Sequence, residues 1–500
     1  MNEKLINKIE NADLYDVVKK TPLEHLENLS KELSNNIYQK REDLQLIHSF
    51  KIRGAYYKIK QLSTAEKKRG VIASSAGNHA QGVAFSAQKN NIKATIIMPK
   101  TTPEIKVKSV KLFGAKVILH GNSYDEAFEY AKKLCKKEQL TFIHPFDDDD
   151  VIAGQGTIGK EILEQLKQID YLFIPVGGGG LIAGISTYIK AYSPSTKIIA
   201  VEPEKSNCFQ ESLRSNTAKT LSSIEIFADG VAVKAMGKIT FEYAKKTVDD
   251  AITVTTDEIC AAIKDIYDNS RAIAEPAGAL SLAGIKKYIK DNEITQKNIC
   301  SILCGGNINF HRLRHISERT EIGENKEILI AIKIPEKKGS FLNLSQHFKD
   351  FEITEFNYRF TSNKEATVFV GFKINTQNEK NAIFNQLNTH NYTFIDLTDN
   401  ECAKIHTRYM IGGKNKSKNE HIIRFQFPEL PGALLKFLES FGTTFDISLF
   451  HYRNHGADYG RVLVGIIVNN DQYNILTQKL QDLNYHYIDE TNNDAIKLFL

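Results

Sequence analysis

The chain has 500 residues, of which 42% are hydrophobic and 25% charged, so it can build several globular domains with apolar cores. The formal net charge is +5, but the lysines are scattered and no basic run carries interleaved aromatics, which disfavours nucleic acid as a partner. No apolar stretch of about 18 residues predicts a membrane span, and no apolar signal segment precedes the first domain. The six cysteines form no CxxC pair, so we expect reduced thiols and a cytoplasmic protein without membrane contact.

From about residue 50 to residue 310, short apolar runs alternate with amphipathic helical patterns such as SYDEAFEYAKKLCKKE (123–138). This alternation indicates βαβ units and open parallel sheets, which bind ligands at the carboxyl ends of their strands. Seven runs predict strands: VIASS (71–75), ATIIMP (94–99), AKVILHG (115–121), YLFIPV (171–176), KIIAVE (197–202), AITVTT (251–256) and ICSILC (299–304).

The first motif of chemical interest is SFKIRGA (49–55), which sets Lys51 between Phe50 and Ile52. Lysine is rarely fully buried unless it is paired or reacting, although a solvated lysine at the start of a helix is the ordinary alternative.

The second motif is SSAGNHAQG (74–82), between a predicted strand and a predicted helix. Its small residues and Asn78 would suit an anion or a polar ring at the helix N-terminus, but Ser, Gly and Asn are also common caps.

The third motif is PVGGGGLIAG (175–184), in which four glycines join a predicted strand to a predicted helix. Consecutive glycines leave backbone N–H groups open to a phosphate. No GK[ST] follows, and the acidic partner of a dinucleotide site is missing. A phosphate site together with an unusual lysine indicates pyridoxal phosphate. The acidic run DDDD (147–150) predicts a solvated loop rather than a metal site.

The last third of the chain contains an internal repeat, which recurs at an offset of 93 or 94 residues in four blocks. IPEKKGSFLNL (334–344) matches FPELPGALLKF (427–437), and FEITEFNYRF (351–360) matches FDISLFHYRN (445–454). Each repeat predicts the order strand, glycine turn, helix, strand, strand, helix, strand. The predicted organisation is a body at 1–325, a module at 326–410, a linker at 411–420 and a second module at 421–500.

SFKIRGA, SAGNHAQG, GGGGLIAG, AEPAGAL (274–280) and LCGGN (303–307) occur in the order and spacing of the fold-type II pyridoxal-phosphate enzymes, which the chain resembles. The repeats resemble the ACT-like regulatory domains of the biosynthetic threonine ammonia-lyases, or threonine deaminases, in phrases such as TEFNYRF, SLFHYR and DETNN. This resemblance covers essentially the whole chain. It implies an α/β fold: a tryptophan-synthase-β-like body with two open parallel-type sheets, followed by two tandem α+β modules.

The resemblance implies pyridoxal phosphate as cofactor and L-threonine as substrate, with L-serine left open as an alternative. Lys51 would form the Schiff base and then remove the α-proton, while Phe50 would pack against the cofactor ring. Asn78 would hydrogen-bond the cofactor's 3-hydroxyl. The cofactor's phosphate would bind at Gly177, Gly178, Gly179, Gly180 and Leu181. The substrate carboxylate would bind at Ser75, Ala76, Gly77, Asn78 and His79.

Cys304 falls where the resembled family places a neutral Ser, Thr or Cys against the pyridine nitrogen. A thiol there would not hold that nitrogen protonated as a carboxylate would, which favours expulsion of the β-hydroxyl. The alternative is a buried small side chain at a strand end. The role of Glu275 is open between a buried acid near the cofactor and a helix N-cap before Pro276.

Two departures from related enzymes are informative. Ala76 stands where serine racemases of this fold carry a second catalytic base, which argues against racemisation. Glu202 matches one acid of the divalent-cation site of those relatives, but Cys208 replaces the second acid. We therefore expect no metal site.

The resemblance further implies inhibition by isoleucine, opposition by valine, and a homotetramer. The repeat makes Tyr358 and Tyr452 equivalent effector candidates. Their flanking residues are Phe356, Phe450, Arg359 and Arg453. The alternative is that these aromatics form the cores of the modules. Three other functions stay open: a degradative serine/threonine dehydratase, a β-replacement synthase, and an amino-acid sensor without turnover.

Overall fold

The computed structural model describes residues 3–310, 312–324, 326–337, 339–359, 365–400, 403, 419–428, 433–441, 444–453, 459–483 and 485–493. Two compact units divide the chain, Met1–Thr320 and Glu321–Leu500, and the division falls within helix α14 (Arg312–Gly323). Among the described residues, no helix combines the length and the apolar character needed to cross a membrane.

The larger sheet of the first unit has six strands in the order β1-β2-β10-β7-β8-β9. Neighbouring strands run parallel except at one edge, where β1 and β2 are antiparallel. The strands are β1 (Leu23–His25), β2 (Asn36–Arg41), β7 (Tyr171–Pro175), β8 (Lys197–Pro203), β9 (Asp250–Val254) and β10 (Asn298–Leu303). Because β2 and β10 are parallel neighbours, Cys304 directly follows the strand beside the one that leads toward Lys51.

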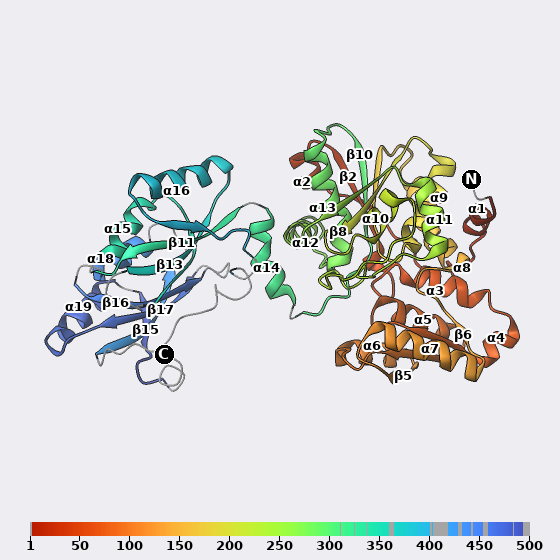
Figure 1. The fold of residues 1–500 in the computed structure, drawn as a ribbon, viewed down its shortest axis with the longest axis horizontal. Helices are drawn as coiled ribbons and strands as arrows, with labels where there is room; N and C mark the ends of the chain where they lie inside the picture. Colours follow the sequence, from red (N-terminus) through yellow and green to blue (C-terminus); the bar gives the residue numbers. More distant parts are fainter. Residues whose placement is uncertain are drawn as a thin grey trace. The chain divides into compact units, whose positions relative to one another are not determined.

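The smaller sheet has four parallel strands in the order β5-β4-β3-β6. They are β3 (Val71–Ser74), β4 (Ala94–Met98), β5 (Lys116–Leu119) and β6 (Thr141–Phe142). Helices α5 (Asn78–Lys89), α6 (Glu104–Leu112) and α7 (Tyr124–Glu138) form a lobe with this sheet (Figure 1). Its central strand β3 ends directly before the loop that carries Asn78.

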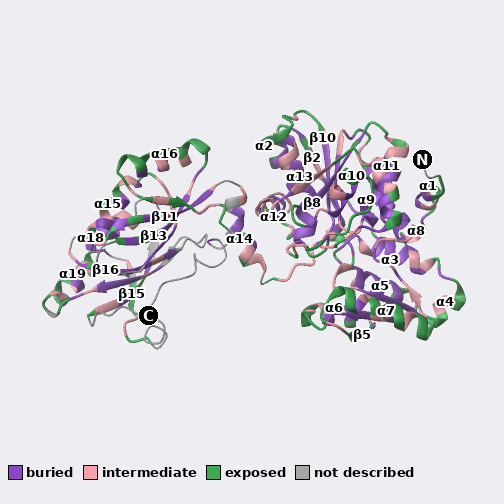
Figure 2. Ribbon diagram, viewed as in Figure 1, coloured by how far each residue is buried: buried purple, intermediate pink, exposed green. Residues whose placement is uncertain are grey.

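The remaining helices of the first unit include α3 and α8, which set the position of Lys51. The inner strands β10, β7 and β8 of the larger sheet and helix α9 are buried along most of their length (Figure 2), as expected for a parallel sheet covered on both faces. The remaining helices of the first unit, in chain order, are α1 (Glu3–Glu10), α2 (Glu27–Glu32), α3 (Lys51–Lys60), α4 (Thr64–Arg69), α8 (Asp149–Gln165), α9 (Gly180–Tyr192), α10 (Cys208–Ser215), α11 (Lys238–Thr247), α12 (Thr256–Ser270) and α13 (Pro276–Asp291).

All seven predicted strands are confirmed, each within two residues of its predicted ends, and the α/β fold with two parallel-type sheets is confirmed. The sequence did not predict β1, β2 or β6. Strand β2 reads NIYQKR, and its polar Gln39 and Lys40 are fully buried, which hides the usual alternation of apolar and polar residues. Strand β6 has only two residues.

The second unit contains one eight-stranded sheet in the order β14-β11-β13-β12-β16-β17-β15-β18. The first repeat follows the predicted element order: β11 (Glu327–Pro335), α15 (Ser340–His347), β12 (Ile353–Arg359), β13 (Glu365–Lys373), α16 (Gln377–Thr389) and β14 (Phe394–Asp396). The second repeat follows it too: β15 (Glu420–Pro428), α18 (Ala433–Phe441), β16 (Asp446–Arg453), β17 (Tyr459–Ile467), α19 (Tyr473–Leu483) and β18 (His486–Asp489). Most of the predicted linker 411–420 lies outside the described residues.

The two repeats meet through the antiparallel pair β12 and β16. Asn357 pairs with His451, which is its own equivalent in the repeat, so the sheet has a local pseudo-twofold at this point. As a result, Tyr358 of one repeat pairs with Phe450 of the other, and Tyr452 pairs with Phe356. The duplicated sequence has therefore produced a symmetric sheet.

Five of the six cysteines are described, and none of these five forms a disulfide bond, as predicted. The sixth, Cys402, lies outside the described residues.

Candidate active site

Lys51 is the first residue of helix α3, and the segment before it is tied to the end of β10. The Phe50 N–H and the Ser49 hydroxyl both donate to the carbonyl oxygen of Cys304, at 3.1 and 3.2 Å. The helix packs closely against its neighbours: a Cβ on Gly54 would lie 2.6 Å from the Val151 carbonyl oxygen of α8. Lys51 is therefore fixed beside Cys304 by backbone contacts.

The Lys51 amine lies in a desolvated setting, although part of the side chain remains accessible. Its Nζ donates to the carbonyl oxygen of Pro145 at 2.9 Å. Burial lowers the pKa of Lys51 to about 8, against the opposing influence of Cys304 and Glu275. An amine with this pKa is neutral far more often at neutral pH than an ordinary lysine, as a nucleophile and proton acceptor requires.

The loop Ser75–Gly77 joins β3 to α5, which begins at Asn78. The Gly77 N–H donates to the Ser75 hydroxyl at 3.2 Å, so the loop has internal structure. His79 is buried, and its Nε2–H donates to the carbonyl oxygen of Ile143 at 2.9 Å. Burial and the neighbouring Lys51 lower the pKa of His79 to about 3, so its ring is neutral. The anion-binding capacity of this loop therefore comes from backbone N–H groups at the start of α5.

The glycine loop follows β7 and leads into α9, with Gly179 at the N-cap position in a left-handed conformation (φ +90°). A Cβ on Gly178 would lie 2.1 Å from Cδ1 of Phe146, and one on Gly177 would lie 2.8 Å from Cα of Val231. Only glycine fits these positions, and the first turn of α9 offers unpaired N–H groups. Such a cradle fits a phosphate.

Cys304 is 3% exposed and follows β10 directly. Its Sγ lies 3.4 Å from the carbonyl oxygen of Ala277. Burial and the nearby Glu275 raise the pKa of the Cys304 thiol well above its ordinary value. The group is therefore a buried neutral thiol, which is compatible both with a partner that does not keep a pyridine nitrogen protonated and with a buried small side chain at a strand end.

Glu275 occupies the N-cap position of α13, but its side chain makes no capping hydrogen bond. Instead, its buried carboxylate accepts a hydrogen bond from Nδ2 of Asn78 at 2.7 Å. Of the two readings left open by the sequence, the buried acid is the one that the structure supports.

The effector candidates Tyr358 and Tyr452 lie in the core of the second unit. Their exposed fractions are 3% and 8%, and Phe356 and Phe450 contact each other with ring centroids 5.5 Å apart. The Tyr358 hydroxyl donates to the carboxylate of Glu336 at 2.8 Å. The alternative that these aromatics form the core is therefore confirmed, and the phenol of Tyr358 also has a polar partner. The side chains of Arg359 and Arg453 lie outside the described residues.

Comparison with known proteins gives the family. Residues 14–305 match the family described as pyridoxal-phosphate dependent enzyme, and residues 318–407 and 411–500 each match the C-terminal regulatory domain of threonine dehydratase. The biosynthetic L-threonine dehydratase of Pasteurella multocida is 50% identical over 98% of this chain and 96% of its own. The chain belongs to the biosynthetic threonine dehydratases.

Further threonine dehydratases agree with this assignment. The biosynthetic L-threonine dehydratase of Escherichia coli is 48% identical over 98% of this chain and 95% of its own. The solved structure of processed threonine deaminase isoform 2 from Solanum lycopersicum is 46% identical, with a TM-score of 0.62, and covers 63% of this chain and 92% of that chain. The pyridoxal phosphate cofactor and the regulatory modules expected from the resemblance are those of this family.

The candidate site of this threonine dehydratase includes residues that the sequence did not reveal. Pro145 supplies a backbone acceptor, and no side-chain pattern encodes that role. The prediction of a solvated loop at DDDD was right only in part, because Asp147 and Asp148 lie in the loop before α8, Asp149 and Asp150 open the helix, and all four are half-buried. Asp147 accepts from the N–H of Ile239 at 2.8 Å at the start of α11, and Asp148 accepts from the N–H of Asp150 at 2.9 Å at the start of α8. For Asp148 the signal was available, because Asp directly before a helical pattern is a typical N-cap, whereas the contact of Asp147 with α11 is too distant in the chain to be read from it.

Glu202, which matches one acid of the divalent-cation site of related enzymes, binds the first turn of a helix. Its two carboxylate oxygens accept the N–H groups of Phe209 and Gln210, each at 2.8 Å, at the start of α10. Burial raises the pKa of Glu202 to about 7. Within the part of the chain that the structure describes, no three His, Cys, Asp or Glu side chains form a group that could hold a metal ion.

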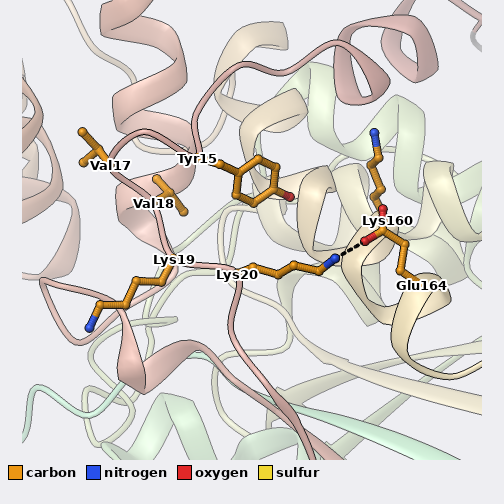
Figure 3. Close-up of a pocket in the computed structure, with 7 residues that line it drawn as sticks. All are labelled: Tyr15, Val17, Val18, Lys19, Lys20, Lys160 and Glu164. Carbon is orange, nitrogen blue, oxygen red and sulfur yellow. Dashed lines mark hydrogen bonds and ion pairs between the residues drawn. The ribbon is translucent and has the colours of Figure 1, made fainter.

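A surface groove of about 640 Å³ lies elsewhere in the first unit, between the segment around Tyr15 and helix α8. Its lining residues are Tyr15, Val17, Val18, Lys19, Lys20, Lys160 and Glu164 (Figure 3). The lysine ammonium groups already have partners, as in the ion pair between Lys20 and Glu164. None of the predicted site residues lines this groove, so it is not the cofactor site.

Proposed function

We propose that this chain converts L-threonine to 2-oxobutanoate and ammonia, the committed step of isoleucine biosynthesis. The observation that carries the proposal is the Lys51 amine beside the neutral thiol of Cys304. Burial lowers the pKa of this amine to about 8. The near full-length similarity to biosynthetic threonine dehydratases supports the choice of substrate.

Pyridoxal phosphate, bound through Lys51, supplies the electron-withdrawing group that makes the substrate's α-hydrogen acidic. Once the substrate's amine has displaced it from the cofactor, the freed Lys51 would accept the α-proton at Nζ, for which it must be neutral. Phe50 would pack against the cofactor ring, Asn78 would donate to its 3-oxygen, and Cys304 would lie near its pyridine nitrogen without charging it. Gly177 to Gly180 and Leu181 would hold the phosphate through backbone N–H groups.

The substrate carboxylate binds at the start of α5, where Ser75, Ala76, Gly77, Asn78 and His79 lie consecutively. The ring of His79 is neutral and engaged with Ile143, so this residue contributes its backbone N–H rather than a charge. The α-proton and the β-hydroxyl would leave together as one water molecule, and a second water molecule would then displace ammonia to give 2-oxobutanoate. Ala76 offers no second proton acceptor, which favours elimination over racemisation.

The two modules regulate this reaction. Isoleucine binds near Tyr358 and Tyr452 and inhibits, and valine opposes it. The functional domains are a catalytic part at 1–325, modules at 326–410 and 421–500, and a linker at 411–420. The protein acts in the cytoplasm as a homotetramer.

The test is 2-oxobutanoate release from L-threonine by the wild type, by Lys51→Ala and by Lys60→Ala. Lys60 lies on the same helix but pairs with Asp13 and Asp16, so its variant is the matched control. Turnover lost in Lys51→Ala and retained in Lys60→Ala supports the proposal. Wild-type protein that binds pyridoxal phosphate without releasing 2-oxobutanoate would contradict it and favour another fold-type II reaction or a sensor.

A further inference from the structure

Three motifs that are far apart in the chain meet at the side chain of Asn78. Its Nδ2 donates to Oε1 of Glu275 at 2.7 Å, and its Oδ1 accepts from Nδ2 of Asn307 at 2.8 Å. Nδ2 of Asn307 also donates to the carbonyl oxygen of Ile47 at 2.8 Å, which anchors Asn307 to the segment before Lys51. The Asn78 amide is thus held from both ends.

These two contacts fix which end of the amide faces which neighbour. When Glu275 is ionised, its carboxylate can only accept hydrogen bonds, so it then requires the Asn78 nitrogen. The Asn307 amide nitrogen can only donate, so it requires the Asn78 oxygen. Rotating the Asn78 amide by half a turn would place oxygen against carboxylate and nitrogen against nitrogen, and both contacts would be lost. With one N–H committed to Glu275, the second N–H of Asn78 is the donor that remains.

The local backbone allows the carboxylate to reach this position only because residue 305 is glycine. A Cβ on Gly305 would lie 2.3 Å from Oε1 of Glu275 and 3.3 Å from Nδ2 of Asn78. The Gly305 carbonyl oxygen also accepts the N–H of Glu275 at 3.2 Å. The glycine of LCGGN, the acid of AEPAGAL and the asparagine of SAGNHAQG therefore form one arrangement.

The electrostatics of Glu275 make its contact with Asn78 important. Burial and the nearby Asp229 raise the pKa of Glu275 to about 7, against hydrogen bonds from Asn78 and the Asn307 backbone. A buried carboxylate needs such donors, because an unpaired buried charge is costly. The hydrogen bond between Asn78 and Glu275 therefore fixes both side chains: it orients the Asn78 amide and it stabilises the buried carboxylate.

We propose that Glu275 and Asn307 are positioning residues that lock the Asn78 amide as a hydrogen-bond donor to the 3-oxygen of the cofactor. The proposal deepens the proposed function, since it rests on Asn78 contacting the cofactor. Neither Glu275 nor Asn307 needs to touch the cofactor or the substrate. The residues act by removing the alternative amide orientation, which would present an acceptor to that oxygen.

The test is Glu275→Gln, which keeps the size of the side chain but replaces one acceptor oxygen by a donor nitrogen. The readouts are the visible absorbance of bound pyridoxal phosphate, the pH at which that absorbance changes, and the affinity for pyridoxal phosphate. The expected result is a shift of that pH by about one unit and about tenfold weaker cofactor binding, because Asn78 would then donate to a neutral amide oxygen, which is a weaker acceptor than a carboxylate.

Glu202→Gln is the matched control. Glu202 is also a buried acid with two backbone N–H partners, and burial raises its pKa to about 7 as well, but it caps α10. Its variant should leave the cofactor's absorbance and titration unchanged. A shift of equal size in Glu202→Gln would mean that loss of any buried acid causes the change, and would overturn the proposal.

Two further variants separate positioning from general damage. Asn307→Ala removes the donor to Asn78 and should move the titration in the same direction as Glu275→Gln. In an Asn78→Ala background, Glu275→Gln should add little, because the two residues act as one unit. A wild-type titration in Glu275→Gln, or a full additional effect without Asn78, would overturn the proposal. Wild-type protein that binds the cofactor but does not act on L-threonine would contradict the proposed substrate and leave this spectral test valid.

Discussion

Arg53, two residues after Lys51, is fully buried and offers the sharpest test of how the lysine is held. Its guanidinium donates to both oxygens of Glu42, each at 2.7 Å, and to both oxygens of Glu161, at 2.6 and 3.0 Å. Lys40 completes the group with an ion pair to Glu161 at 2.7 Å. Two cations therefore balance two anions, and all four side chains are inaccessible to water.

The perturbation is Arg53→Met, which retains much of the side-chain volume and removes the charge. Lys40 would then face two buried carboxylates, and one negative charge would be uncompensated. Breaking a buried pair from one side costs about 3–5 kcal/mol, so we expect a loss of this size in the free energy of unfolding of the first unit. Removing Glu42 as well, in Arg53→Met/Glu42→Gln, restores charge balance and should recover part of the loss.

The loss should depend on pH. Burial alone would raise the pKa of Glu161, but the charge and hydrogen bonds of Arg53, with Lys40, outweigh it and lower that pKa in the wild type. A lowered pKa contributes stability above the unfolded value of about 4.5 that is lost as pH falls. Without Arg53 this contribution shrinks and Glu161 accepts a proton more easily. The difference between variant and wild type should therefore narrow from pH 7 toward pH 5.

The assay is urea-induced unfolding at one fixed pyridoxal phosphate concentration, followed by the absorbance of the bound cofactor, which reports on the first unit. The control is Lys31→Met, which removes an exposed i,i+4 pair with Glu27 and should cost less than about 0.5 kcal/mol. A loss below about 1 kcal/mol in Arg53→Met, or a larger loss in the double variant, would refute the reasoning.

Three further predictions follow from the sites described above. The rate at which cofactor-free protein takes up pyridoxal phosphate should rise about tenfold per pH unit below pH 8 and level off above pH 8, because only neutral Lys51 reacts. A rate that stays constant from pH 6 to pH 8 would contradict the lowered pKa of that amine. Gly178→Ala should weaken pyridoxal phosphate binding at least about tenfold in an equilibrium titration, since the new Cβ would lie 2.1 Å from Phe146. An unchanged affinity would show that the glycine loop can move to make room for the Cβ. Tyr358→Phe should raise the isoleucine concentration for half-inhibition about tenfold, because it removes the hydroxyl that donates to Glu336 in this structure. The rate without isoleucine should not change. An unchanged isoleucine concentration for half-inhibition would exclude Tyr358 from the effector site.

The sequence predicted the parts of the fold that depend on local apolar pattern. The seven strands that it indicated are present because each is a short apolar run between turn residues, and the repeat correctly predicted two modules with equivalent elements. Strand β2 was missed because Lys40 and Gln39 are polar, and only the tertiary partners of Lys40 explain its burial. Local pattern cannot report a partner that is distant in the chain.

The same limit applies to the site. The motif around Lys51 and the glycine loop could be recognised, since their residue types alone indicate an amine and a phosphate cradle. The partnership of Asn78 with Glu275 and Asn307 could not, because these residues are 197 and 229 positions away from Asn78. The backbone acceptor at Pro145 has no side-chain signature at all. These features depend on how the strand ends of two sheets are brought together.

The most direct test of the account is the steady-state release of 2-oxobutanoate from L-threonine by the full chain, measured across a range of L-isoleucine concentrations. We expect turnover that isoleucine suppresses and that valine partly restores. Absence of turnover in protein that carries pyridoxal phosphate would contradict the central claim, and turnover indifferent to isoleucine would contradict the regulatory role of the two modules.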